Sequence, residues 1–146
     1  MKAFAALYRE LDASTSSLAK QAALQRYLRA VPPGDAAWAV YFLAGGKPRQ
    51  LVPTKLLRSL ARDVAGLPEW LFDESYEAVG DLAETISLLL PAPAAPVARG
   101  LAAWIEQHLL PLRGRAPEPL AELLRAQWRE LAPDERFVYF KLLTGG

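Results

Sequence analysis

The sequence has no cysteine among its 146 residues and a single histidine, His108. Without thiols the chain can form neither disulfides nor thiolate metal sites, a composition that suits a reducing cytoplasm. His108 has no second metal ligand at a suitable spacing. We therefore expect it on the surface or near a helix end, and we expect no metal site.

Long apolar runs and targeting segments are also missing. The longest apolar stretch, residues 86–98, contains three prolines and is too short to span a bilayer. Arg9 and Glu10 interrupt the apolar run at the N-terminus, so no signal peptide is evident. These absences predict a cytoplasmic protein.

Catalytic motifs are absent as well. The sequence has neither the phosphate-binding pattern G-x-x-x-x-G-K-[ST] nor G-x-G-x-x-G. Three carboxylates, Asp73, Glu74 and Glu77, cluster on one predicted helix, and a solvated face explains them better than an acid–base pair. We assign no catalytic residue and expect this chain, taken alone, to be a binding module rather than an autonomous enzyme.

What the chain does contain is helical periodicity, and no segment alternates in the way of an amphipathic strand. Serine, aspartate, threonine, proline and glycine mark the expected helix ends, with Asp35, Thr54 and Asp81 as predicted N-caps. The predicted helices cover about residues 4–11, 16–30, 35–45, 54–66, 68–80, 81–90, 99–110, 119–131 and 134–143. The expected fold class is all-α.

A short aromatic module occurs twice, as WAVYFLAGG ending at Gly45-Gly46 and as FVYFKLLTGG ending at Gly145-Gly146. The copies lie 100 positions apart. The same offset pairs Leu24 with Leu124, Arg29 with Arg129, Pro33 with Pro133, Asp35 with Glu135 and Leu43 with Leu143. So long a period indicates two related halves rather than a solenoid.

We expect one domain, residues 1–146, with half 1 at about 1–90, half 2 at about 98–146 and a stiff Pro/Ala connector at 91–97. The second copy stops where the first continues into a basic loop. The sequence is therefore expected to be truncated, as a fragment of a longer protein.

Charge is strongly segregated along the chain, although the net charge is only +1. Residues 1–62 carry +7, residues 63–90 carry −7 with no base among them, and residues 91–146 carry +1. Such segregation can set up a basic face that attracts a polyanion. The alternative is that solvated faces merely happen to sort in this way.

The loop after the first Gly-Gly is the most plausible binding site. Glycine lets backbone N–H groups approach a ligand closely, and the helix beginning near Thr54 offers open amides and a positive dipole end to a phosphate. The candidate residues of this site are Gly45, Gly46, Lys47, Arg49, Gln50, Thr54, Lys55 and Arg58. Taken alone, Gly-Gly is more often just a helix stop.

Three segments carry a resemblance to a known family: AAWAVYFLAGGKPRQLVPTKLL (36–57), GLPEWLFDESYEAVGDLAETISLLLP (66–91) and ERFVYFKLLTGG (135–146). They resemble the N-terminal DNA-binding domain of bacterial ATP-dependent DNA ligases. The resemblance implies an all-helical body of two pseudo-symmetric halves whose loops grip the minor groove on both sides of a nick. Those loops fall on Gly45 to Lys55 and on Thr144, Gly145 and Gly146.

The resemblance also implies partners and cofactors that lie outside this chain. Adenylation and OB-fold domains, using ATP and Mg²⁺, would seal the nick while this domain holds the duplex. The chain lacks the K-x-D-G adenylation motif, so we expect it to be inactive alone and to bind no cofactor itself. We also expect it to be a monomer. The implied setting is nucleoid DNA during repair, replication and recombination.

A rival interpretation is an all-α protein-interaction scaffold whose acidic segment, residues 63–90, is the docking face. In that interpretation Trp70 and Phe72 would serve the interface. Large aromatic side chains are more often buried, so we expect both rings in the core.

Overall fold

The computed structural model describes residues 1–93 and 95–145, and within them it contains helices and no strand, which confirms the all-α prediction. The α-helices are α1 (Lys2–Ala13), α2 (Ser17–Ala30), α3 (Pro33–Leu43), α4 (Thr54–Ala65), α5 (Glu69–Val79), α6 (Leu82–Leu89), α7 (Leu101–Ala103), α8 (Pro117–Glu130) and α9 (Arg136–Thr144). The π-helical segment η1 (Trp104–Leu109) and the 3₁₀ turn η2 (Leu110–Leu112) follow α7, and the 3₁₀ turn η3 (Pro133–Glu135) leads into α9. None of the described helices is long and apolar enough to cross a membrane.

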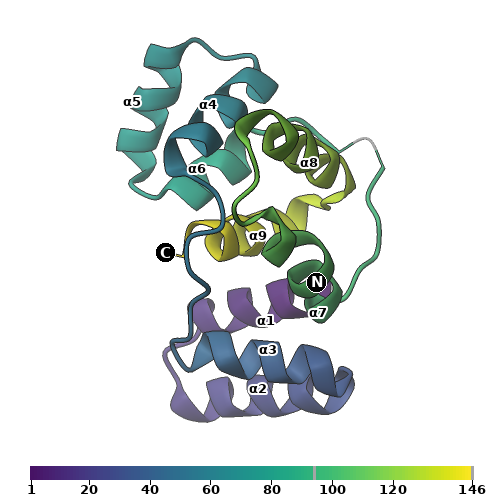
Figure 1. Ribbon diagram of the computed structural model, residues 1–146. Helices are drawn as coiled ribbons and strands as arrows, with labels where there is room; N and C mark the ends of the chain where they lie inside the picture. The colour runs from purple at the N-terminus through teal and green to yellow at the C-terminus, as the bar shows by residue number, and fades with distance from the viewer. Residues whose placement is uncertain (94, 146) are drawn as a thin grey trace.

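Helix α9 occupies the middle of the molecule (Figure 1). Helices α1, α2 and α3 stack at one end, and α4, α5 and α6 lie at the other. Two aromatic side chains of the second copy of the module lie in the core: Tyr139 and Phe140 are fully buried, and Trp104 of η1 packs edge-on against Tyr139 at 5.6 Å between ring centroids. Because α9 is surrounded by other helices, its sequence is apolar on nearly every side.

Several predicted helix ends are confirmed. The Ser16 hydroxyl caps α2 by accepting a hydrogen bond from the amide of Ala19, and Asp81 caps α6 through the amide of Glu84. Helices α4 and α5 end at Gly66 and Gly80, both left-handed. Left-handed backbone is the conformation that glycine adopts most readily at a helix C-terminus.

Two predicted caps are wrong. Helix α3 begins at Pro33, whose fixed φ suits the first turn, so Asp35 lies inside the helix and accepts instead from the amide of Ala102 at the start of α7 (2.9 Å). Helix α4 has Pro53 as its N-cap, and Thr54 is its first residue. In both places proline, rather than the polar side chain, sets where the helix starts.

The sequence offset of 100 residues is also an offset of local structure. Helix α2 spans residues 17–30 and α8 spans 117–130, while α3 begins at Pro33 and η3 at Pro133. Both acidic counterparts accept from an amide at a helix start, but Glu135 bonds Ala132 within its own turn at 3.1 Å whereas Asp35 reaches α7. The repeat therefore extends beyond the aromatic module to a pair of helices, α2 and α3 in the first copy and α8 and α9 in the second.

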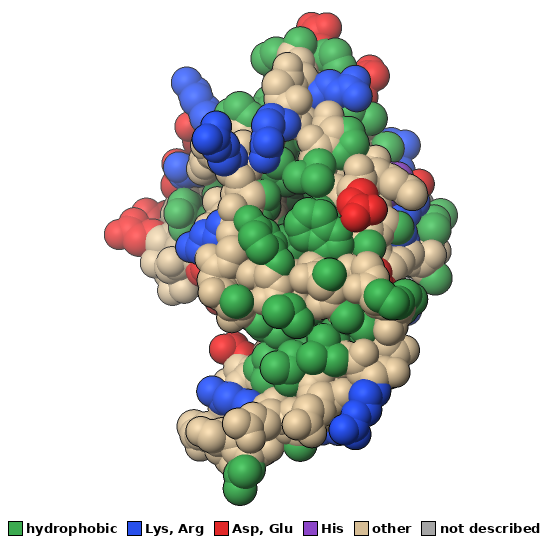
Figure 2. Space-filling view, turned by 60° about the horizontal axis from the view of Figure 1, so that its bottom comes forward, with side chains coloured by type: hydrophobic (Ala, Val, Ile, Leu, Met, Phe, Trp, Pro, Cys, Tyr) green, Lys and Arg blue, Asp and Glu red, His purple; other side chains and the backbone are tan. Residues whose placement is uncertain are grey.

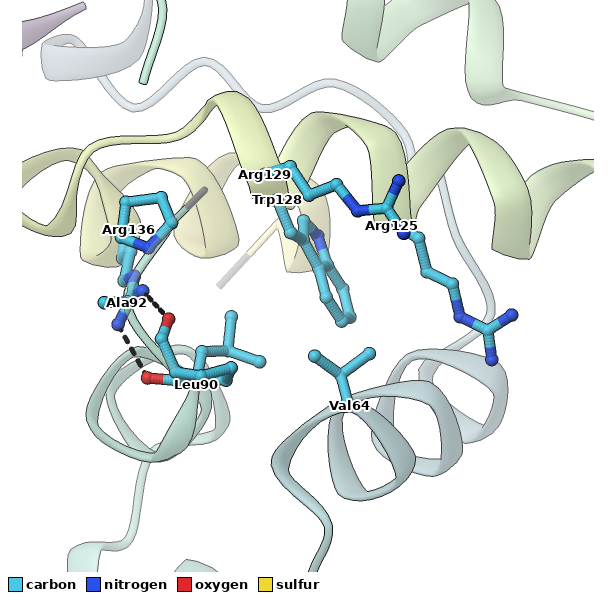
Figure 3. A pocket seen from close by; sticks show the side chains of 9 residues that line it. Val64, Leu90, Ala92, Arg125, Trp128, Arg129 and Arg136 are labelled. Atoms are coloured by element: carbon cyan, nitrogen blue, oxygen red, sulfur yellow. Dashed lines mark hydrogen bonds between the residues drawn. The ribbon is translucent and has the colours of Figure 1, made fainter. Parts of the chain in front are cut away.

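Polar contacts join α6 and α9 at both ends of their antiparallel packing. At one end the ammonium of Lys141 pairs with Asp81. At the other, the buried guanidinium of Arg136 donates to the carbonyl oxygens of Leu90 (2.9 Å) and Pro91 (Figure 3). These carbonyls follow the last turn of α6, where no intrahelical donor is available to them.

Replacing Asp81 by alanine should lower the free energy of unfolding by about 1–2 kcal/mol, because α6 loses its N-cap and Lys141 its partner. Asp81→Asn keeps a capping oxygen and should cost less. Urea denaturation measures both, with the exposed Glu77→Ala as the control. Equal losses for the alanine and asparagine variants would contradict the capping role.

Stability should also depend on the charge of Asp81. Burial, the largest influence, raises the pKa of this carboxyl, but the hydrogen bond and charge of Lys141 and the neighbouring amides together hold it below its ordinary value of 3.8. A lowered pKa in the folded state contributes stability that is present above pH 4 and is lost as the pH falls below about 3.8. Asp81→Asn should show a smaller fall over that interval, as measured by urea denaturation from pH 5 to pH 3.

Candidate nucleic-acid interface

The first glycine turn is a helix stop of the Schellman type. Gly45 has φ 95° and donates its N–H to the Phe42 carbonyl at 3.0 Å, and Gly46 donates to the Tyr41 carbonyl at 2.8 Å. Both amides are therefore used inside the turn. The expectation that these glycines offer their N–H groups to a ligand does not match this geometry; they shape the turn and aim the segment that follows.

The second glycine turn lies directly beside the first. Gly145 ends α9 with φ 66° and donates to the Lys141 carbonyl at 3.0 Å, while the Thr144 hydroxyl donates to Phe140 at 2.9 Å. A Cβ placed on Gly145 would lie 3.7 Å from the Pro48 carbonyl oxygen. In Figure 1 the end of α9 meets the segment that joins α3 to α4. Gly146, a predicted site residue, lies outside the described residues.

We call residues 45–55 together with residues 144–145 the glycine-turn surface. Leu51 and Val52 are fully buried and anchor it to the core. Lys47, Arg49 and Gln50 lie exposed on the other side of the same segment. The two buried residues thus fix a short irregular segment whose polar side chains all reach solvent.

The start of α4 supplies the open amides of this surface. Pro53 provides no side-chain cap, so the first-turn N–H groups of α4 keep the unpaired character of a helix N-terminus. Gln50 donates its amide to the Thr54 hydroxyl at 2.9 Å, which ties the segment to the helix. Lys55 is exposed one residue further on. An anion placed here would meet backbone donors and the positive end of the α4 dipole.

Arg58, another predicted site residue, is not a mobile charge. Its guanidinium pairs with Asp73 of α5 at 2.9 Å and lies over the Tyr76 ring at 5.1 Å. The guanidinium of Arg62, also on α4, lies 3.7 Å from the carboxylate of Glu69 of α5. The acidic segment therefore neutralises the positive charge of these two arginines of α4. On the face drawn in Figure 2, Lys and Arg side chains lie in separate groups toward the edges rather than in one patch.

Lys47, Arg49 and Lys55 differ from Arg58 in this respect. No carboxylate of the described residues forms a salt bridge with any of the three. The excess positive charge of the candidate interface is thus concentrated on the segment between the first glycine turn and α4.

Sequence reasoning missed two further groups of cations. Arg125 and Arg129, four residues apart on α8, extend to the same side of the Trp128 ring and line with it a hollow of about 290 Å³, which Val64 and the residues after α6 also line (Figure 3). Arg113 lies near Lys47 and Arg49 in a second hollow. The i, i+4 spacing of Arg125 and Arg129 was visible in the sequence, whereas the approach of Arg113 depends on tertiary packing.

The structure also shows where three single residues of the sequence analysis lie. Phe72 is 2% exposed, as expected, but Trp70 is 66% exposed on α5, so its predicted burial is wrong. His108 lies half-buried in η1 beside the Trp104 ring, and burial together with the charge of Arg99 lowers its pKa. No group of three or more possible metal ligands occurs within residues 1–93 and 95–145.

Gly46→Ala should destabilise the fold by about 1–3 kcal/mol, because an added Cβ would lie 2.5 Å from the Tyr41 ring and 2.6 Å from its carbonyl oxygen. Gly34→Ala is the matched control, since its Cβ would meet only the Ala102 side chain at 3.5 Å. Thermal and urea unfolding measure both variants. If the two lose the same stability, Tyr41 does not close over the turn as described.

Comparison with known proteins yields one family. The sequence model of the family described as DNA ligase N terminus matches residues 1–146. No curated protein matches the chain.

Proposed function

The chain belongs to the DNA ligase N-terminal family, and from this membership we propose that it holds nicked duplex DNA through the glycine-turn surface. One observation carries the proposal: Gly145 of the second glycine turn lies beside Pro48, which follows the first turn, and the same segment carries three cations without an ion-pair partner among the described residues. This arrangement suits a polyanion whose phosphates recur at regular intervals.

The proposed contacts are to the sugar-phosphate backbone. Lys47, Arg49 and Lys55 would neutralise phosphates, and the open amides of α4 would hold one more. Gln50 and Thr54 are neutral donors that can fix the position of the backbone. Phosphates carry no sequence information and the minor groove presents a degenerate pattern, so binding would be largely independent of sequence.

The glycines act through shape in this proposal. Gly45 and Gly46 turn the chain sharply so that the Lys47 side chain reaches solvent, and Gly145 makes a second left-handed turn at the end of α9. Arg58 contributes less than the other cations because Asp73 already neutralises it. The second turn would then meet the duplex beside the first, on the opposite side of the nick.

Family membership implies DNA and the remaining ligase domains as partners. We propose further that these are an adenylation domain and an OB-fold domain of a bacterial enzyme that uses ATP and Mg²⁺. They would join a 3′-hydroxyl to an adenylated 5′-phosphate while this domain keeps the ends aligned. The proposed setting is nucleoid DNA in the cytoplasm, during repair, replication or recombination, with the protein as a monomer.

A second candidate function rests on α5. Trp70 stands 66% exposed among the carboxylates of the acidic segment, which suits an aromatic anchor in a protein interface. Such an interface is compatible with DNA binding, since α5 contributes no residue to the glycine-turn surface. Trp70→Ser separates the two functions: it should leave DNA affinity unchanged and weaken docking of a protein partner.

Replacing Lys47 and Arg49 together by alanine should weaken binding to nicked duplex similarly for unrelated sequences. Three neutralised phosphates predict that log K falls with log salt at a slope of about −3, and removing two cations should reduce that slope by about 2. Fluorescence anisotropy with labelled nicked duplex from 50 to 200 mM salt measures both quantities.

The matched control removes the same charge elsewhere. Lys20 and Arg29 are exposed on α2 and lie outside the glycine-turn surface, so their double alanine variant should keep the wild-type slope. A wild-type slope near zero, or equal losses in the two double variants, would remove the proposed site.

A further inference from the structure

A hollow with aromatic walls adjoins the glycine-turn surface. It has a volume of about 640 Å³ and is lined by Trp38 and Tyr41 of α3, Lys47 and Arg49 of the segment after the first glycine turn, and Leu110 and Arg113 around η2. It is thus assembled from three parts of the chain. Two of its cations, Lys47 and Arg49, also belong to the glycine-turn surface.

The two rings of this hollow are held in place by their surroundings. Trp38 stacks on Phe42 with ring centroids 5.9 Å apart and meets Tyr41 edge-on at 5.8 Å. Its indole N–H donates to a Glu106 carboxylate oxygen at 2.9 Å, and the Tyr41 hydroxyl donates to the Lys47 carbonyl at 3.3 Å. Tyr41 nevertheless remains 44% exposed. An aromatic surface that is both fixed and accessible costs little conformational entropy to bind against.

The hollow carries an excess of positive charge. Lys47, Arg49 and Arg113 are exposed, and none forms a salt bridge within the described part of the chain. One carboxylate approaches the rings: Glu106 accepts the Trp38 indole N–H and keeps its own negative charge, against the three positive charges of the cations. Cations beside aromatic rings are the combination with which proteins bind single-stranded nucleic acid. The phosphates pair with the cations, and the bases stack on the rings.

We propose that this hollow binds unpaired nucleotides of a single-stranded extension that leaves the duplex held on the glycine-turn surface. The inference rests on the proposed function, because Lys47 and Arg49 border both sites. Bases inside a duplex are stacked on one another and cannot reach recessed rings, so the aromatic walls add nothing to a duplex grip. An unpaired base can enter and stack, and the preferred substrate becomes a nicked duplex that carries a flap.

The test compares two nicked duplexes that differ only in a flap of about ten thymidines, a length within the range of known single-strand sites. The wild-type chain should bind the flapped duplex about fivefold more tightly or better, as expected for at least one stacked base. Arg113→Ala should abolish this difference. Arg115→Ala, an equal charge change outside the hollow, should preserve it.

A second measurement follows the ring itself. Stacking of a thymine on Trp38 should quench part of the tryptophan fluorescence when the flapped duplex binds, and the unflapped duplex should not produce this quenching. Trp38→Phe keeps an aromatic ring packed against Phe42 and should remove the flap-dependent quenching, while the emission of the other tryptophans remains.

The outcomes distinguish the two proposals. If the wild type binds unflapped nicked duplex and the flap adds neither affinity nor quenching, the hollow is not a single-strand site and the proposed function stands. If Arg113→Ala weakens both duplexes by the same factor, Arg113 belongs to the duplex grip and the inference is overturned. If the wild type binds neither duplex, the proposed function fails and the inference falls with it.

Discussion

The antiparallel packing of α6 against α9 is the contact on which the candidate interface depends. Helix α9 carries the second glycine turn, and α6 belongs to the group of helices that begins with α4, at the end of the segment after the first glycine turn. Arg136 holds the carbonyls after α6 at one end, and the Asp81–Lys141 pair closes the other. Each of these contacts joins a residue of α9 to the start or the end of α6, so together they oppose sliding of one helix along the other.

Which cations of this protein stay without an ion-pair partner depends on which helices become neighbours, and not on the net charge of the segment in which they lie. The acids of α5 lie beside the arginines of α4 and neutralise them, as Arg58 and Asp73 show at 2.9 Å. Lys47 and Arg49 form no such pair with a described carboxylate, and their segment is anchored to the core by Leu51 and Val52. A sequence with near-zero net charge can therefore keep a small cationic surface beside a large neutralised one.

The helical fold, most helix ends and the repeat could be predicted from the sequence because apolar period, glycine and proline are local signals. Gly66, Gly80 and Asp81 show this. The sequence could not show that Asp35 reaches across to Ala102, that Asp73 neutralises Arg58, or that Arg113 approaches Lys47, because each depends on which helices become neighbours. Trp70 was misjudged for the opposite reason: residue type predicts burial only on average, and this ring faces outward from α5.

The bond from Asp35 to α7 makes the two repeated modules chemically distinct. In the first module Asp35 accepts from a distant helix, α7, whereas in the second Glu135 accepts from its own turn and pairs with the N-terminal amine of Met1 at 3.3 Å. The two copies could therefore not exchange places: the Asp35 carboxylate fastens the first copy to α7, and that of Glu135 holds the start of the chain.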